Sequence, residues 1–182
     1  VADNREHVTY TGVYKGMPIS CTSTGMGCPS TAIAMEELAR VGAKTFLRIG
    51  TCGTFQDFIH NGDIIVFDSA CRYEGTSKLY VPPEFPAVAH HQVIQACADA
   101  VEALGYPYHI GTTRSADTFF AGHPAPGSSY NGYWNSSWAH LFEDLRRMNV
   151  YGAEMEASIV LVLGRIWGLR AGGMAVCLDN LL

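Results

Sequence analysis

Hydrophobic and polar positions follow one another along this chain in a way that predicts strands and helices in turn. Residues 8–14 and 17–23 alternate in the manner of two strands joined by a turn at Lys15 and Gly16. Short apolar runs predict further buried strands at 44–50, 64–67, 107–114 and 171–178. Helical spacing predicts helices at about 29–41, 87–104, 137–148 and 154–167. This order implies an α/β fold with a largely parallel sheet that helices cover on both faces.

Two irregular segments interrupt the pattern. Residues 74–86 carry three prolines, and residues 121–135 are rich in Gly, Pro, Ser and Asn with aromatic residues between them. Long loops of this kind often carry function or move. We see no internal repeat and no second domain, and 182 residues are enough for one sizeable core. We therefore expect a single domain over 1–182, incomplete at both ends, because Val1 is not a methionine and Leu182 directly follows a strand.

Composition narrows the class of protein and of partner. Hydrophobic residues make up 48% and charged residues 16%, which fits a compact globular domain. The formal net charge of −5 gives no reason to expect nucleic acid or an anionic membrane as a partner. The six cysteines include no CxxC pair, so a zinc site is not expected, and they suit the core of a protein in a reducing, cytoplasmic compartment. No apolar run is long enough to span a bilayer.

Arg48 is the first candidate for chemistry. It stands near the carboxyl end of the apolar run 44–50, and Gly50 and Gly53 follow it at once. A buried arginine is costly unless an anion meets it, and glycines let the backbone come close to that anion, with Thr51 adding a hydroxyl. The segment alone is explained equally well by an oxyanion pocket and by a structural ion pair with a carboxylate.

Two further segments carry groups that suit an anion or a sugar. Residues 23–30 form a glycine-containing turn from strand to helix, and helix N-termini bind anions, although a tight turn without a ligand explains this segment better on its own. Glu154 and Glu156 lie at the start of a predicted helix with Met155 between them. They suit simple capping, or they could bind the vicinal hydroxyls of a sugar with Met155 against its apolar face.

Two candidates stand at strand ends nearer the C-terminus of the chain. Phe119 follows the strand 107–114 and could stack on a flat ring, although ordinary core packing explains it at least as well. Asp179 ends the last strand, where active sites of open α/β sheets gather, although an Asp-Asn pair is also common in turns.

Together these segments resemble the nucleoside phosphorylases of the uridine phosphorylase type. Matching motifs occur in one order along nearly the whole chain, at 23–38, 46–53, 61–66, 83–89, 115–120 and 154–158. The resemblance implies a distorted, partly barrel-like central sheet of mixed but largely parallel strands, flanked by helices. It also implies an enzyme, a pentosyltransferase that cleaves a pyrimidine nucleoside, uridine, with inorganic phosphate as co-substrate and no cofactor, giving free base and ribose 1-phosphate.

By position, the resemblance assigns the phosphate site first. Arg48 and Thr51 would hold the phosphate, and Thr51 would also approach the ribose. Arg5 matches an arginine that the family lends to the phosphate site of a neighbouring subunit, so a homo-oligomer, dimer or hexamer, with shared active sites is expected. Glu6 and Ser30 match positions that hold a monovalent cation, K⁺, between subunits in some members.

The resemblance also assigns the sugar and the base. Glu156 would bind ribose hydroxyls as a catalytic residue together with Arg48, with Met155 packing beside the sugar and Glu154 supporting it. Gly53 would lie close to the base, and Phe119 would stack on it.

The base end departs from the family pattern. Where the family has Gly-Gln-x-Arg, this chain reads Gly122-His123-Pro124-Ala125, so His123 is the base-binding residue expected here and Ala125 offers no charged partner. Another donor, such as Arg114, could take over, specificity could have changed, or residues could be missing near 123. Asp179 matches the region where purine-specific relatives place a proton donor. The alternatives to uridine phosphorolysis are therefore a purine nucleoside phosphorylase or nucleosidase, and a non-catalytic nucleoside-binding homologue.

Overall fold

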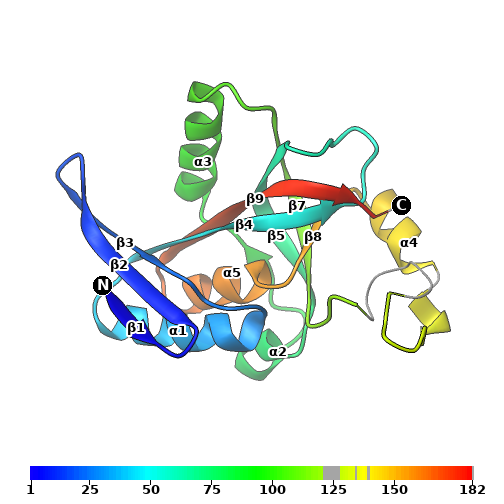
Figure 1. Ribbon diagram of the computed structural model, residues 1–182, viewed down its shortest axis with the longest axis horizontal. Coiled ribbons are helices and arrows are strands. Elements are labelled where there is room, and N and C mark those ends of the chain that lie inside the picture. Colours follow the sequence, from blue (N-terminus) through cyan, green and yellow to red (C-terminus); the bar gives the residue numbers. More distant parts are fainter. Residues whose placement is uncertain (121–127, 134, 139, 182) are drawn as a thin grey trace.

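The computed structural model describes residues 1–120, 128–133, 135–138 and 140–181 of the chain. These residues form two β-sheets (Figure 1). The smaller sheet is antiparallel and contains β1 (Ala2–Asn4), β2 (His7–Tyr14) and β3 (Met17–Thr22). The larger sheet contains β4 (Thr45–Thr54), β5 (Ile64–Tyr73), β6 (Ala87–Val88), β7 (Tyr108–Ala116), β8 (Val150–Glu154) and β9 (Arg170–Asn180).

The larger sheet is mixed and curls toward a barrel. Its strand order is β6-β5-β7-β8-β4-β9, and a further pairing joins β5 to β9. Strand pairs β4–β9, β5–β7 and β7–β8 are parallel, whereas β4–β8, β5–β9 and β5–β6 are antiparallel. The β5–β9 pairing connects the two flanks of the sheet, which confirms the expected α/β fold with a partly barrel-like central sheet.

The helices lie on both sides of this sheet. They are α1 (Cys28–Arg40), α2 (Thr76–Tyr80), α3 (His91–Ala103), α4 (Leu141–Arg147) and α5 (Ala157–Ile166), and a short 3₁₀ helix, η1, spans Ser136–Trp138. In Figure 1, α1, α2 and α5 lie below the sheet and α3 lies above it. Residues 157–164 of α5 are all buried, because this helix is apolar on every side and packs between α1 and the sheet. None of the helices described here is long and apolar enough to cross a membrane.

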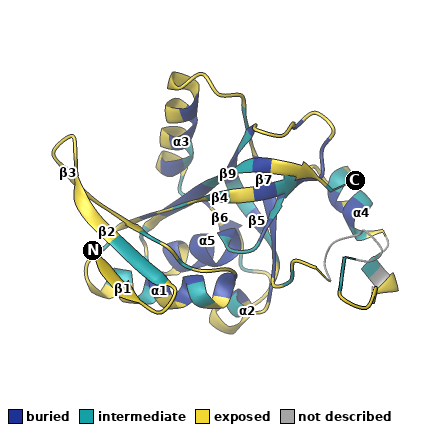
Figure 2. Cartoon of the chain, viewed as in Figure 1, coloured by how far each residue is buried: buried dark blue, intermediate teal, exposed yellow. Residues whose placement is uncertain are grey.

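The smaller sheet extends from the body of the molecule. In Figure 2 the hairpin of β2 and β3 is largely exposed, in contrast to the buried α5. The turn of this hairpin is at Lys15 and Gly16, as the sequence predicts, and both residues have positive φ, 48° and 80°. The hairpin therefore contributes little to the core that positions the candidate site.

Several predicted boundaries are wrong, and each has a local cause. The helix expected from 87 begins at His91, because residues 87–88 pair with β5 and the His90 side chain accepts a hydrogen bond from the Gln92 N–H at 3.3 Å. The helix expected from 154 begins at Ala157, because the preceding residues form β8, a strand that the sequence did not indicate. The loop 74–86 contains the unexpected helix α2.

Two adjacent rows of residues cross the larger sheet near its strand ends. The first row runs from β5 to β9 through Cys71, Arg114, Ala153, Gly53 and Asp179, each paired in register with the next. The second row lies one residue further along three of these strands and consists of Arg72, Ser115 and Glu154. Because side chains alternate along a strand, the two rows face opposite sides of the sheet. The candidate site is built around these rows.

Candidate functional site

Arg48 lies between two carboxylates. Its Nε is 3.1 Å from Oε2 of Glu154, and its Nη2 is 2.5 Å from Oε2 of Glu156. The Arg48 side chain is only 12% exposed, and its Nη1 has no hydrogen-bond partner among the residues described. The guanidinium folds back over Gly50, where a Cβ atom would lie 2.7 Å from Nη1. A glycine is therefore required at position 50 to make room for this side chain.

The charges around Arg48 are strongly coupled. Burial, the largest influence, acts to lower the pKa of Arg48, but Glu154 and Glu156 overcome it and raise the pKa above its ordinary value. The guanidinium therefore remains a cation. Of the two readings of this segment, the ion pair is present in this structure, and the unpaired Nη1 leaves the cation able to accept a further anion.

Glu154 is the buried anchor of the site. It ends β8, and its Oε2 accepts hydrogen bonds from the N–H groups of Glu156 and Ala157, both at 2.7 Å, at the beginning of α5. Its Oε1 accepts a hydrogen bond from the Ser115 hydroxyl, whose oxygen in turn accepts the N–H of Ser158 at 2.9 Å. Burial raises the pKa of Glu154, while Arg48 and these hydrogen bonds oppose the shift. Glu154 thus fixes the start of α5 and orients Arg48.

Glu156 joins Arg48 to the N-terminus of α1. Its Oε1 accepts a hydrogen bond from the Gly27 N–H at 2.6 Å, while its Oε2 contacts Arg48. Gly27 caps α1 with a positive φ of 91°, a conformation that favours glycine. A helix N-terminus and an arginine are the two groups that bind anions most readily in proteins. The Glu156 carboxylate therefore occupies a position that suits an incoming anion.

Two further residues predicted for phosphate and sugar, Thr51 and Met155, belong to the same segments as Arg48 and the two glutamates. Thr51 is exposed on β4, three residues after Arg48. Met155 is half-buried between the two glutamates, and its carbonyl oxygen accepts a hydrogen bond from Cys28 Sγ at 3.2 Å. The predicted capping and sugar-binding segment 154–156 and the glycine turn 23–30 are thus brought together from distant parts of the chain.

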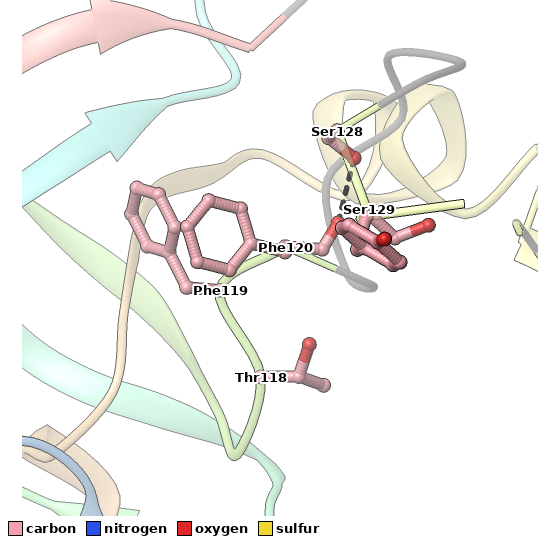
Figure 3. A pocket seen from close by; sticks show the side chains of 6 residues that line it. Thr118, Phe119, Phe120, Ser128 and Ser129 are labelled. Atoms are coloured by element: carbon pink, nitrogen blue, oxygen red, sulfur yellow. Dashed lines mark hydrogen bonds between the residues drawn. The ribbon is translucent and has the colours of Figure 1, made fainter. Parts of the chain in front are cut away.

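The residues predicted for the base lie beyond this centre. Phe119 is 67% exposed and contacts Phe120 edge to face, with ring centroids 5.2 Å apart. Both rings line an open hollow of about 530 Å³ together with Thr118, Ser128, Ser129 and Tyr130 (Figure 3). The segment with His123 and Ala125 lies outside the described residues.

Gly53 and Asp179 are paired in register on neighbouring strands. A Cβ atom on Gly53 would lie 2.8 Å from the Leu181 side chain, so Leu181 covers the surface that the missing side chain leaves. Asp179 is exposed at the end of β9. Sequence reasoning did not identify Leu181 as a neighbour of Gly53, because their contact depends on the pairing of β4 with β9.

The three remaining candidates lie in the turn between β1 and β2, which carries Arg5 and Glu6, and in the first turn of α1, which carries Ser30. Arg5 is exposed in the turn after β1 and has a positive φ of 58°. Glu6 Oε1 and Ser30 Oγ are 3.0 Å apart, so the two residues predicted for a cation do lie together. No cluster of three or more His, Cys, Asp or Glu side chains suited to a metal ion occurs within the described part of the chain.

Two groups of the site carried no assigned role at the sequence level. Ser115 holds Glu154 and the start of α5, and the Gly27 N–H holds Glu156. Ser115 falls in a matched motif, but its role depends on the register of β7 with β8, which no local pattern reveals. The Gly27 contact spans 129 positions in the chain.

Known proteins similar to this chain are phosphorylases. The sequence model of the phosphorylase superfamily matches residues 1–182. A uridine phosphorylase of Thermococcus kodakarensis is 51% identical over 180 residues, which are 99% of this chain and 64% of that protein. A uridine phosphorylase of Escherichia coli is 39% identical over 99% of this chain and 71% of that protein. A guanosine phosphorylase of Halorubrum lacusprofundi is 39% identical over 100% of this chain and 69% of that protein. The chain thus spans slightly less than two thirds of the first of these relatives.

Proposed function

The chain belongs to the phosphorylase superfamily, and on that premise we propose that it catalyses the phosphorolysis of uridine to uracil and ribose 1-phosphate. The observation that supports this most strongly is the arrangement of Arg48 between Glu154 and Glu156, beside the N-terminus of α1. It combines a fixed cation for phosphate with a carboxylate for the hydroxyls of a sugar. The similarity of this chain to uridine phosphorylases supports uridine as the proposed nucleoside.

In the proposed reaction, an oxygen of phosphate attacks C1′ of the ribose while the bond from C1′ to the base breaks. Positive charge develops on the sugar and negative charge on the base in the transition state. Arg48 holds the phosphate, and Thr51 on the same strand contributes a hydroxyl. Fixed charges of this kind act where charge develops, which is a large source of catalysis in many enzymes.

Glu156 has two successive roles in this proposal. Before phosphate arrives, it neutralises Arg48 and accepts the Gly27 N–H. A phosphate dianion carries more charge than a carboxylate, so it competes for the same two groups and releases Glu156. The freed carboxylate can then accept hydrogen bonds from the ribose hydroxyls, with Met155 packed beside the sugar. Glu154 remains in place throughout, because its contacts with Ser115 and the start of α5 are independent of the substrate.

Purine phosphorolysis is the second candidate. Asp179 lies next to Gly53 in the register of β4 and β9, where it could protonate a departing purine. The similarity to a guanosine phosphorylase supports the same possibility. The two candidates differ in the base and share the phosphate and sugar sites.

The test compares uridine with inosine, each with and without inorganic phosphate, by following free base and ribose 1-phosphate. The proposal expects uridine cleavage that requires phosphate. Faster cleavage of inosine would replace uridine by a purine nucleoside, and cleavage without phosphate would indicate a nucleosidase. Binding of nucleoside without turnover of either substrate would indicate a non-catalytic homologue.

We also propose that two subunits share each active site, with Arg5 of one subunit reaching the phosphate of the other and a monovalent cation between Glu6 and Ser30. Arg5 is exposed in the turn between β1 and β2, where it can reach a partner. Arg5→Ala and Arg48→Ala should each be inactive, and co-expression of the two should restore activity to about one quarter of the sites in randomly mixed dimers. Mixed dimers without recovered activity would exclude the shared site.

A further inference from the structure

Arg114 is a second buried arginine in the larger sheet, and its surroundings are aromatic. The residue is 4% exposed. Its guanidinium carbon lies 5.4 Å from the centre of the Tyr73 ring, 5.9 Å from that of Trp138 and 5.6 Å from that of Phe142. These distances are in the range of cation–π contacts. The rings hold the cation without neutralising it.

Arg114 forms no ion pair with any of the described residues, and its Nε has no hydrogen-bond partner among them. The ten residues outside the described set, 121–127, 134, 139 and 182, include no Asp or Glu in the sequence. Burial lowers the pKa of Arg114, because the charged form has lost water without gaining a carboxylate. An uncompensated buried cation is costly, so its presence calls for an explanation beyond packing.

Arg114 lies on the face of the sheet opposite to Glu154, the face that it shares with Gly53, which is predicted to lie close to the base. It belongs to the same row across the sheet as Ala153 and Gly53, two strands from Gly53, which corresponds to about 10 Å between their backbones. Phe142, one of its three rings, belongs to the same apolar cluster as Leu181, the residue that covers Gly53. Figure 1 shows α4, the end of β9 and the segment after β7 at one end of the molecule.

The row between Arg114 and Gly53 carries only small side chains, and Leu181 covers its Gly53 end. Ala153 carries only a methyl group between Arg114 and Gly53, and Gly53 carries no side chain. Tyr73 is 45% exposed, so the aromatic surroundings of Arg114 border the solvent on that side. A planar base that displaces Leu181 from Gly53 would extend along Ala153 toward the guanidinium.

We propose that Arg114 binds a carbonyl oxygen of the departing pyrimidine base and stabilises the negative charge that develops there, a role for which position 125 offers only Ala125. This inference rests on the proposed phosphorolysis. The same face of the sheet presents no other arginine or lysine in the row from Cys71 to Asp179.

The proposed chemical step produces negative charge on the base, and Arg114 would bind the base where this charge develops. HPO₄²⁻ attacks C1′, and the C1′–N1 bond breaks with its electron pair remaining on the base. The resulting uracil anion delocalises its charge onto the carbonyl oxygens, where an N–H donor of Arg114 binds it more strongly than the neutral base. Water then protonates the base, and the ribose 1-phosphate monoanion releases its proton to solvent. The apolar rings strengthen the interaction because they exclude water.

The test compares Arg114→Met with the wild-type chain on uridine and 5-fluorouridine. Methionine fills similar space among the rings without a charge. We expect kcat/KM for uridine to fall about 10²–10³-fold, the typical cost of removing one such donor. The loss should be smaller for 5-fluorouridine, because the fluorine itself stabilises the departing anion. Arg114→Lys keeps the charge without the planar guanidinium, so its loss of kcat/KM should be smaller but again larger for uridine than for 5-fluorouridine. This variant tests the inference if Arg114→Met does not fold.

Two binding measurements separate this inference from the proposed function. Arg114→Met should weaken the binding of uracil and leave the binding of ribose 1-phosphate unchanged. The control Phe142→Leu disturbs the same cluster but keeps the guanidinium, so it should affect both nucleosides equally. Equal losses of Arg114→Met on uridine and 5-fluorouridine would overturn the inference, as would unchanged uracil binding. A wild-type chain that binds uracil through Arg114 without cleaving uridine would overturn the proposed function alone.

Discussion

Arg48 and Arg114 both belong to strands of the larger sheet and have largely covered side chains, but their surroundings have opposite electrostatic character. Arg48 contacts the carboxylates of Glu154 and Glu156 at 3.1 and 2.5 Å. Among the described residues, the Arg114 guanidinium lies against aromatic rings, forms no ion pair and keeps an unpaired Nε. Correspondingly, the pKa of Arg48 is raised by its carboxylates, and the pKa of Arg114 is lowered by burial.

The difference shows what each end of the site is prepared to bind. At the Arg48 end, a carboxylate already fills the anion position, so only a stronger anion can replace it. At the Arg114 end, the cation is uncompensated, so even a weak acceptor such as a carbonyl oxygen gains from it. One end therefore suits phosphate, and the other suits a neutral base that becomes negative only as its bond breaks.

Replacing Arg48 by methionine should have the largest effect. Glu154 and Glu156 would lose their shared cation, and breaking a buried pair in this way costs about 3–5 kcal/mol of unfolding free energy. The phosphate contact would be lost as well, so we expect kcat/KM to fall by about 10³-fold, as for arginines in other phosphoryl sites. Chemical denaturation and steady-state kinetics measure the two effects.

The matched control for this variant is Arg40→Met. Arg40 is also an arginine near a glutamate, Glu36, but its side chain is 77% exposed on α1. Such a pair contributes little, so stability and activity should hardly change. If Arg48→Met retained activity near that of the control, Arg48 could not be the phosphate ligand.

The sequence indicated the elements of the fold well where the hydrophobic pattern is regular. The hairpin of β2 and β3, helix α1 and strand β7 lie close to their predicted ranges, whereas β5 begins at Ile64 as predicted but continues to Tyr73. Strand β8 was missed because residues 150–154 are few and end in a charged residue, Glu154, whose burial depends on Ser115 and Arg48. Helix α2 was missed because three prolines dominate its loop.

The sequence predicted only some of the residues of the candidate site. Arg48, Glu154 and Glu156 were identified, and the structure brings them together. Their partners, Ser115 and the Gly27 N–H, follow from strand register and from contacts over long separations, which no local pattern contains. For the same reason, the sequence could name Arg114 as a donor but could not show that it lacks a carboxylate.

Glu156→Gln should have the next largest effect and should separate phosphate binding from turnover. The amide can still accept the Gly27 N–H, but it no longer neutralises Arg48. Phosphate should then bind about tenfold more tightly, a change of about 1.4 kcal/mol, because it no longer competes with a carboxylate. Turnover should fall about 10²-fold, because the ribose hydroxyls lose a charged acceptor.

Calorimetric titration with inorganic phosphate and steady-state kinetics test these opposite changes. Glu36→Gln serves as the control, because it removes the same negative charge from the ion pair with Arg40 on α1. Weaker phosphate binding by Glu156→Gln would show that the carboxylate supports phosphate rather than competing with it. The interpretation that the Glu156 carboxylate fills the anion position beside Arg48 would then be wrong.

Arg114→Met should change stability in the direction opposite to Arg48→Met. Removing an uncompensated buried cation relieves a desolvation cost, and methionine packs well against aromatic rings. We expect the free energy of unfolding to stay equal or to rise by up to about 2 kcal/mol, although activity falls. Denaturant titration measures this change. A loss of stability as large as that of Arg48→Met would mean that Arg114 serves the fold.

Glu143→Gln should have the smallest effect and completes the comparison with an exposed ion pair. Glu143 lies on α4 next to Phe142 and contacts Arg146 and Arg147, both at 2.8 Å. The hydrogen bond from Arg146, followed by that from Arg147, lowers the pKa of Glu143 from 4.5 to about 2. Because the pKa is lower in the folded state, its stabilisation is present above pH 4.5 and is lost as the pH falls toward 2.

The wild-type chain and Glu143→Gln should therefore differ slightly in thermal midpoint near neutral pH and converge in acid. Solvent screens this exposed pair, so the difference should be smaller than that of any buried variant and should shrink further at high salt. Uridine phosphorolysis should be unaffected, because α4 reaches the base end through Phe142 and not through Glu143. A reduced rate with uridine but not with 5-fluorouridine would instead show that the charge of Glu143 influences Arg114 from the surface of α4.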